Sequence, residues 1–427
     1  MFRSITDFIL QKKELISNVK NAGLYFSGSI VQSILSLVAS PIYSLHLSAK
    51  EFGILGYFGA ISNFLSPIFI LGMSSIYLMR YFKQGDEDNK KLLFNITFFL
   101  CCFNTILIVV SYASIYFYFK FMNVNLPLNP FAWFILIALL LENIKSFVLL
   151  NFRIRKKALS FFIFSSVNSI LNFGLGILFV AYFNWGAEGR MSAPIISSLF
   201  MLPFCIYLLH RYSTINFNFN GFLRSAKAAI PLVLAAYAYV PIANIDLFYL
   251  ERLNNLSELG LYNIGITIAG YVQLAYIALG IAIEPDIFKA VAEKDNNKLI
   301  KSAVIIFIPY FLFVIIFMFL SGTVISILTA GRYLEAERYT NIALISVFLM
   351  GVYWFLDKIF IALEKTKLNL IINVIGGASS IVITYFAVNS FKFIGAAYGK
   401  VLVALLLCIV SLILVIKYLR KDRLLSE

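Results

Sequence analysis

Long apolar runs follow one another along almost the whole chain, and only short polar turns separate them. Each run is close to the ~20 residues that an α-helix needs to cross the hydrocarbon core of a bilayer. The composition agrees, because 61% of the residues are hydrophobic and only 13% are charged, which is more apolar surface than a soluble core can bury. The sequence therefore predicts an all-α integral membrane protein with twelve transmembrane helices, at residues 24–47, 52–79, 92–119, 131–151, 159–183, 192–210, 228–250, 260–283, 302–328, 340–363, 368–388 and 394–416.

One stretch occurs twice, about half a chain apart. Glu51-Phe-Gly opens an apolar run that ends in a basic segment and a polar turn, and Glu258-Leu-Gly opens a second run of the same kind, 207 residues later. A repeat of half-chain length predicts two pseudo-symmetric six-helix bundles that enclose a cavity. We expect an N-terminal bundle at 1–211, a cytoplasmic linker at 212–227 and a C-terminal bundle at 228–427.

Lysine and arginine are distributed unevenly between the two sets of turns. One side carries 25 of the 35 basic residues and the other side 8, while Lys145 and Lys358 lie within predicted spans. The positive-inside rule therefore predicts a multi-pass protein with both termini in the cytoplasm. The net charge of +14 does not indicate nucleic-acid binding, because it is spread over short turns. The four cysteines lie in apolar runs without metal-binding spacing, so we expect neither a metal site nor a disulfide framework.

Several local motifs resemble one family of transporters. They are Pro41, Leu47, Glu51-Phe-Gly53, the basic turn at 155–157 and Trp185-Gly-x-x-Gly-Arg190. In these features the chain resembles the Wzx-type O-antigen and polysaccharide flippases, which belong to the multidrug/oligosaccharidyl-lipid/polysaccharide (MOP) exporter superfamily. The resemblance covers the whole chain, but its motifs identify the superfamily better than the substrate.

The resemblance implies a MATE-like fold and a function in the bacterial inner (plasma) membrane. A protein of this family moves undecaprenyl-diphosphate-linked oligosaccharide repeat units from the cytoplasmic to the periplasmic leaflet by alternating access, for the synthesis of O-antigen, capsule or exopolysaccharide. It implies a cation-lined cavity and coupling to H⁺ or Na⁺, with no other cofactor. On this reading we expect a lipid-linked oligosaccharide substrate, and a polymerase and a chain-length regulator of the same pathway as partners.

Basic side chains within or at the ends of spans are the candidates for substrate binding. A diphosphate is anionic, so lysine or arginine along its route lowers the barrier to crossing. The candidates are Lys145, Arg190, Lys358 and Lys400. Each also has a structural interpretation. Glu142 and Lys145 share a helix face at i, i+3 and can neutralise each other, and the other three can be interface anchors that extend towards water.

Three acidic residues within spans are candidates for ion coupling: Asp246, Glu142 and Asp357. A carboxylate inside a membrane is costly unless it is paired, hydrated or protonated. Asp246 is the strongest of the three candidates. The alternative is that it pairs structurally with a nearby lysine or arginine.

The repeat also predicts a gate. An offset of 206 places Asp286 at the position equivalent to Arg80, with Glu284 as its helical neighbour. Equivalent ends of a pseudo-symmetric pair can meet, so we expect Arg80 to bridge Asp286 or Glu284 when the cavity is closed to the cytoplasm. Ordinary interfacial charges are the alternative.

Two other functions remain open at this stage. A cation-coupled exporter of drugs or other small molecules from the same superfamily would use acidic cavity residues, whereas the charges here are mixed. A membrane polysaccharide polymerase would need a large external loop with catalytic arginine or histidine. The outer loops are short and the histidines are His46 and His210. We therefore expect a transporter without catalytic residues rather than an enzyme.

Overall fold

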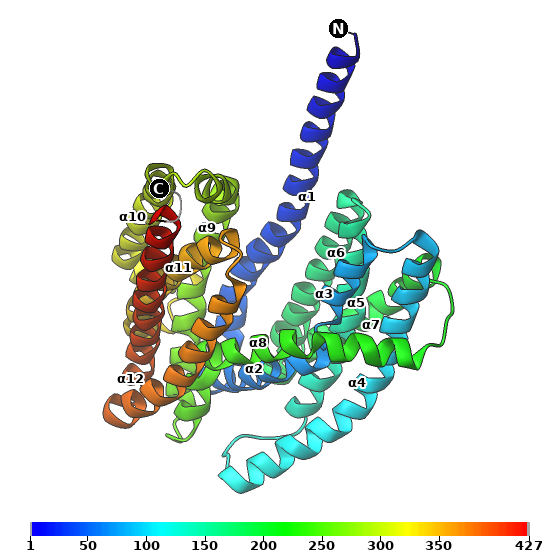
Figure 1. Ribbon diagram of the computed structural model, residues 1–427. Helices are drawn as coiled ribbons and strands as arrows, with labels where there is room; N and C mark the ends of the chain where they lie inside the picture. Colours follow the sequence, from blue (N-terminus) through cyan, green and yellow to red (C-terminus); the bar gives the residue numbers. More distant parts are fainter. Residues whose placement is uncertain (1, 425–427) are drawn as a thin grey trace. The chain divides into compact units, whose positions relative to one another are not determined.

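The computed structural model describes residues 2–424, and the predicted domain ends at residue 1 and at 425–427 lie outside this range. Within it the chain is helical and contains no strand (Figure 1). The elements are α1 (Phe2–His46), α2 (Ala49–Ile70), α3 (Met73–Tyr81), α4 (Asp86–Met122), α5 (Phe131–Ile154), α6 (Ala158–Ile177), the π-helix η1 (Leu178–Tyr182), α7 (Gly186–Tyr212), α8 (Phe219–Glu251), α9 (Leu256–Ala292), α10 (Asn296–Leu328), the 3₁₀ turn η2 (Leu334–Ala336), α11 (Glu337–Ala362) and α12 (Thr366–Leu424).

The predicted all-α membrane fold is confirmed. In the described part of the chain, ten helical segments are long and apolar enough to cross a membrane. The last of them contains two predicted spans, because the non-helical backbone at Lys392 divides α12. The predicted span 260–283 lies in α9, so all twelve predicted spans fall on helical segments. The span predicted at 52–79 is divided between α2 and α3 rather than forming one helix.

The chain divides into two compact units. Unit 1 comprises residues 1–46, 65–123 and 127–232, and unit 2 comprises 47–64, 124–126 and 233–427. In unit 1, α1 packs on α6, α7 packs on α5 and α6, and α4 packs on α5. In unit 2, α11 packs on α9, α10 and α12. The helix α2 contributes to both units, and the predicted division at 211 and 228 stays a prediction.

The repeated Glu-x-Gly motif has a clear local role in unit 2. Ser48 and Glu51 cap the start of α2, since the backbone N–H of Ser48 donates to the Glu51 carboxylate at 2.7 Å. The side chain of Asn255 accepts from the backbone N–H of Glu258 at 3.1 Å and caps α9 in the same position. Two residues later in each copy, Gly53 and Gly260 lie against each other's helix. A Cβ on Gly53 would lie 2.6 Å from the carbonyl oxygen of Leu256, and one on Gly260 would collide with the carbonyl of Ala49.

The two repeats differ in how the helix continues. In the first copy α2 ends at Ile70, and Leu71 and Gly72 adopt left-handed backbone angles, with φ of 48° and 60°, before α3 begins. Gly72 packs against Ala229 and Leu232 of α8. In the second copy α9 continues without a break to Ala292 and tolerates Pro285 inside it. The break is therefore specific to the first half.

Candidate functional site

Lys145 lies at the centre of a polar cluster inside unit 1. Its amine is 2.7 Å from the carboxylate of Glu142 on the same face of α5, and it donates to the amide oxygen of Asn168 on α6 at 3.1 Å. The side chain of Lys145 is 5% exposed, whereas that of Glu142 is 61% exposed. Next to them, Asn143 donates to the carbonyl of Phe69 at 3.1 Å. Unit 1 therefore holds a buried cation whose counter-ion is accessible from outside.

Asp246 and Lys400 form the corresponding ion pair of unit 2, with the burial reversed. The Lys400 amine is 3.1 Å from the Asp246 carboxylate and donates to the carbonyl of Ala243 at 2.8 Å. Asp246 is 3% exposed and also accepts a hydrogen bond from the buried Tyr262. Its second oxygen, Oδ1, has no hydrogen-bond partner within the described part of the chain. The structural interpretation of Asp246, a pair with a nearby basic residue, is thus present in the geometry.

A second polar group in unit 2 surrounds Asp357 on α11. Lys358 pairs with Glu284 of α9 at 2.6 Å, while the adjacent Asp357 points elsewhere, as neighbouring residues on a helix must. The Asp357 Oδ1 atom is buried and has no hydrogen-bond partner among the described residues. One turn earlier, Tyr353 donates to Asn373 of α12 at 2.8 Å. Asp357 therefore combines an unpartnered carboxylate oxygen with a neighbouring network of hydroxyl and amide groups.

Arg190 at the start of α7 has a different environment from Lys400, its counterpart in the repeat. Its guanidinium lies 5.1 Å from the ring centre of Tyr43 and 5.5 Å from that of Phe173, and it is 3.5 Å from the amide oxygen of Asn172. A guanidinium over aromatic faces is held by cation–π attraction and still has free donor directions. Arg190 therefore has no carboxylate partner in the described structure.

Two of the three residues predicted to form a gate, Arg80 and Glu284, have partners within their own units. Arg80 of unit 1 donates to the hydroxyl of Ser225 at 2.8 Å. In unit 2, Glu284 is engaged by Lys358, and Asp286 is exposed at the surface. A bridge from Arg80 to Asp286 or Glu284 would join the two units, and it stays a prediction.

Five polar side chains beside the candidate residues were not predicted. Four of them hydrogen-bond a candidate directly: Asn168, Tyr262, Asn172 and Ser225. The fifth, Asn373, accepts from Tyr353, one helical turn before Asp357. Asparagine within an apolar run is a signal that could have identified Asn168 and Asn373, because an amide in hydrocarbon needs a partner. Tyr262 carries no such signal, since tyrosine is common throughout this chain.

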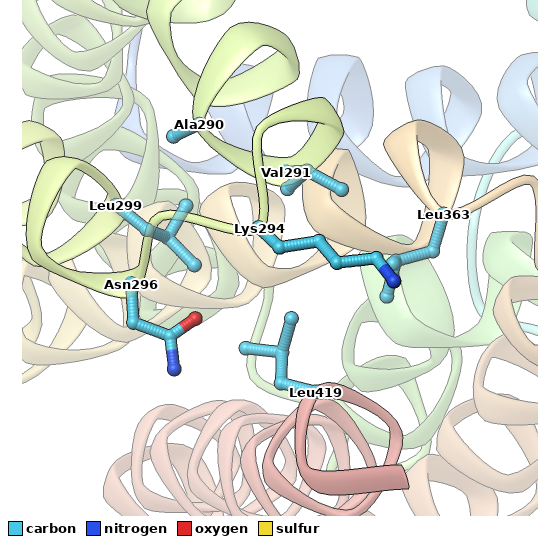
Figure 2. Close-up of a pocket in the computed structure, with 7 residues that line it drawn as sticks. All are labelled: Ala290, Val291, Lys294, Asn296, Leu299, Leu363 and Leu419. Atoms are coloured by element: carbon cyan, nitrogen blue, oxygen red, sulfur yellow. The ribbon is translucent and has the colours of Figure 1, made fainter. Parts of the chain in front are cut away.

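The predicted site residues line neither of two hollows that lie in the described part of the chain. The first, in unit 2, has a volume of about 20 Å³, room for one water molecule. Figure 2 shows its lining, where the side chain of Lys294 runs past Val291 towards Leu363. The second, in unit 1, measures about 290 Å³ and is lined by Phe134, Trp185, Glu188 and Ser192. In the described part of the chain, no group of three or more histidine, cysteine, aspartate or glutamate side chains could hold a metal ion.

No family model and no curated protein matches the chain. Solved structures do match, and they show that this chain shares its fold with transporters described as members of the MOP superfamily.

Three of these structures illustrate the likeness. A lipid II flippase, MurJ, in an inward closed conformation aligns with a TM-score of 0.70 and 16% identity, over 93% of this chain and 89% of its own. An inward-facing MATE family multidrug resistance transporter of the MOP superfamily aligns with a TM-score of 0.67 and 14% identity, over 91% of this chain and 96% of its own. A point mutant of the MATE transporter VcmN of Vibrio cholerae aligns with a TM-score of 0.61 and 15% identity, over 96% of this chain and 100% of its own. All three are transporters or flippases rather than enzymes.

Proposed function

We propose that this protein flips a lipid-linked oligosaccharide, carried on a diphosphate, from the cytoplasmic to the outer leaflet of a bacterial inner membrane. The observation that carries the proposal is the amine of Lys145, which lies inside a helical unit with only 5% of its side chain exposed. A buried amine in a membrane span is costly and marks a functional site by default. The fold that the chain shares with a protein described as a lipid II flippase also supports the proposal.

The geometry around Lys145 suggests how an anionic headgroup would be received. Glu142 is mostly exposed, so it can turn away from the amine without disturbing the packing of the helices. A phosphate oxygen can then take its place and accept a charge-assisted hydrogen bond. Asn168 would keep the amine oriented during the exchange. Arg190, Lys358 and Lys400 are the further basic positions that we assign to the route.

We assign ion coupling to Asp246, Asp357 and Glu142, with H⁺ or Na⁺ as the driving ion and no other cofactor. Asp246 is the most deeply buried of the three, and protonation there would release Lys400. The same pathway would supply a polymerase and a chain-length regulator as partners. Arg80, Glu284 and Asp286 are proposed as the cytoplasmic gate.

The test is the substitution Lys145→Ala, measured by complementation of a strain that lacks its flippase and by accumulation of lipid-linked glycan on the cytoplasmic face. Losing one charge-assisted hydrogen bond costs about 1.5–3 kcal/mol, which corresponds to roughly a 10- to 100-fold loss of flipping at 1.4 kcal/mol per factor of ten. Lys145→Arg should retain part of the activity.

The matched control is Lys120→Ala, which removes an exposed lysine at the end of α4. It should leave flipping unchanged. Normal flipping by Lys145→Ala, at wild-type membrane abundance, would contradict the proposal.

A second candidate is a cation-coupled exporter of drugs or small molecules. The unpartnered buried oxygen of Asp357 favours it, together with the likeness to MATE transporters. Efflux of ethidium that depends on Asp357 but not on Lys145 would identify this function instead.

A further inference from the structure

The turn between α6 and α7 in unit 1 is built to hold aromatic rings in fixed positions. It begins with the π-helix η1, a local widening that is frequent at functional sites. Asn184 and Gly186 both take left-handed angles, with φ of 57° and 55°. Between them, the backbone N–H of Trp185 donates to the carbonyl of Phe179 at 3.0 Å. These constraints fix the backbone that carries Trp185.

Three rings stack on this turn. Trp185 lies over Phe179 at a centroid distance of 5.0 Å and over Phe183 at 5.5 Å, with interplanar angles of 22° and 27°. Gly189 makes the stack possible, because a Cβ there would come within 3.0 Å of both Trp185 and Phe179. Even so, 51% of Trp185 remains exposed. The turn therefore presents a rigid aromatic face that loses little conformational entropy on binding.

The exposed face of Trp185 forms one wall of the larger of the two hollows, the one in unit 1. Phe134, at the start of α5, supplies a second apolar wall, and Glu188 and Ser192 on α7 supply polar atoms. Glu188 is exposed and takes part in no ion pair in the described part of the chain. The hydroxyl of Ser192 donates to the carbonyl of Gly189 at 3.1 Å, which leaves its lone pairs as acceptors. The hollow thus combines aromatic walls with hydrogen-bond acceptors and has a volume of about 290 Å³.

We propose that this hollow, lined by Phe134, Trp185, Glu188 and Ser192, binds a sugar ring. A pyranose has an apolar C–H face that stacks on an aromatic ring and an edge of hydroxyl donors that a carboxylate and a hydroxyl accept. An organic cation would also suit an aromatic wall beside a carboxylate. The Ser192 acceptor and the two apolar walls fit a neutral, hydroxyl-edged ring better. The volume is close to the lower limit for a small-molecule site.

The position of the hollow along the helices indicates at which step of transport a sugar would bind there. It lies at the end of α6 and the start of α7, whereas the basic turn at 155–157 precedes α6 at its other end. Under the predicted orientation the basic turn is cytoplasmic, so the hollow faces the outer side. The site would then receive the sugar portion of the substrate after its diphosphate has passed Lys145. This placement rests on the proposed function.

Binding can be measured directly through Trp185 in the full-length protein in detergent. The other tryptophans are Trp133 and Trp354, and replacing both with phenylalanine leaves Trp185 as the single reporter. The probes are D-glucose, D-galactose, N-acetyl-D-glucosamine and L-rhamnose, titrated separately, with tetraphenylphosphonium as the cationic probe. We expect a saturable change in fluorescence with at least one sugar. Glu188→Gln and Phe134→Leu should each lower the affinity for this sugar at least tenfold.

The matched control is Tyr182→Leu, which removes a 75% exposed aromatic ring on the same turn that does not line the hollow. It should leave sugar binding unchanged. The inference fails if no sugar gives a saturable response, if only tetraphenylphosphonium does, or if Tyr182→Leu weakens the sugar as much as Phe134→Leu.

The site and the proposed function can fail separately. Sugar binding should persist in Lys145→Ala, in which flipping is expected to be strongly reduced. If sugar binding is absent while flipping still requires Lys145, only the sugar site is wrong. If sugar binds while the Lys145→Ala variant still flips its substrate normally, the sugar site is supported and the proposed role of Lys145 is wrong.

Discussion

The two units each hold an amine within membrane-spanning helices, but they hold it in opposite ways. In unit 1 the amine of Lys145 is buried and its carboxylate partner Glu142 is 61% exposed. In unit 2 the carboxylate of Asp246 is buried at 3% exposure, and Lys400, at 16%, covers it. The first arrangement allows the counter-ion to be exchanged for another anion. The second is fixed by Tyr262 and by the carbonyl of Ala243.

This difference separates two tasks that a sequence repeat would assign equally to both halves. An exchangeable pair suits a transient anionic ligand, because the exposed carboxylate of Glu142 can move away from the amine. A fixed pair changes state only when a proton or another cation competes for the carboxylate. Among the proposed residues, Lys145 of unit 1 is therefore the one best suited to exchange its partner for a headgroup, and Asp246 of unit 2 the one best suited to couple an ion. The first of the following experiments tests that asymmetry.

The largest effect should come from removing the buried member of each pair. Asp246→Ala leaves the largely buried amine of Lys400 without its carboxylate, and an uncompensated buried charge costs about 3–5 kcal/mol, so this variant should unfold at a markedly lower temperature in detergent. Lys145→Met removes the buried charge itself and leaves Glu142, whose side chain is 61% exposed, and the loss of an exposed pair costs about 0–1 kcal/mol. Thermal unfolding of the two purified variants measures the difference.

The double variant Asp246→Ala with Lys400→Met is the control for this comparison, because it removes both charges. It should recover part of the lost stability. Equal destabilisation by Asp246→Ala and Lys145→Met would end the distinction between a fixed and an exchangeable pair.

An intermediate effect is expected at the proposed gate. Arg80→Asp and Asp286→Arg should each lower flipping about tenfold, equivalent to 1.4 kcal/mol, because each places like charges at the contact. The charge-swapped double variant should restore activity. Complementation measures all three, with Ser225→Ala as the control for the bond that Arg80 makes inside unit 1. A double variant no better than the single ones would count against the gate.

The smallest effect concerns the polar turns that precede α4 and α10. Asp295 caps α10 by accepting from the backbone N–H groups of Asn297 and Lys298, whereas Gly85 at the start of α4 has no side-chain cap. Asp295→Ala should lower the unfolding temperature slightly, and Gly85→Asp should raise stability by a few tenths of a kcal/mol. Differential scanning fluorimetry of the two variants checks the signs. No gain from Gly85→Asp would mean that the first turn has no uncapped donors to satisfy.

The Asp295 cap should also depend on pH. The backbone hydrogen bond from Lys298 lowers the pKa of Asp295 below its ordinary value of 3.8. A group with a depressed pKa contributes stability above its unfolded pKa and loses it as the pH falls through the folded pKa. The difference between wild type and Asp295→Ala should therefore be constant near neutral pH and shrink below about pH 4.

The sequence was sufficient for the helices and for local pairs. Apolar runs of span length predict helices whatever their partners are, and the i, i+3 spacing of Glu142 and Lys145 brings them together once the helix forms. Contacts between segments that are distant in the chain could not be predicted from the sequence. Lys400 reaches Asp246 because α12 packs beside α8, which no periodicity reveals. The break at Leu71 and Gly72 and the π-helix η1 depend on neighbouring helices and on backbone angles that the residue types alone do not determine.

The glycines of the repeated Glu-x-Gly motif have a consequence for how the chain can change over time. Gly53 lies against Leu256 and Gly260 against Ala49, and both pairs are related by the same shift of 207 residues, so each copy meets the other as two identical subunits meet across a dyad. Neither copy can acquire a larger residue here without displacing its twin. At this contact the halves of a duplicated chain are bound to evolve together, although they have diverged in the charges that they carry.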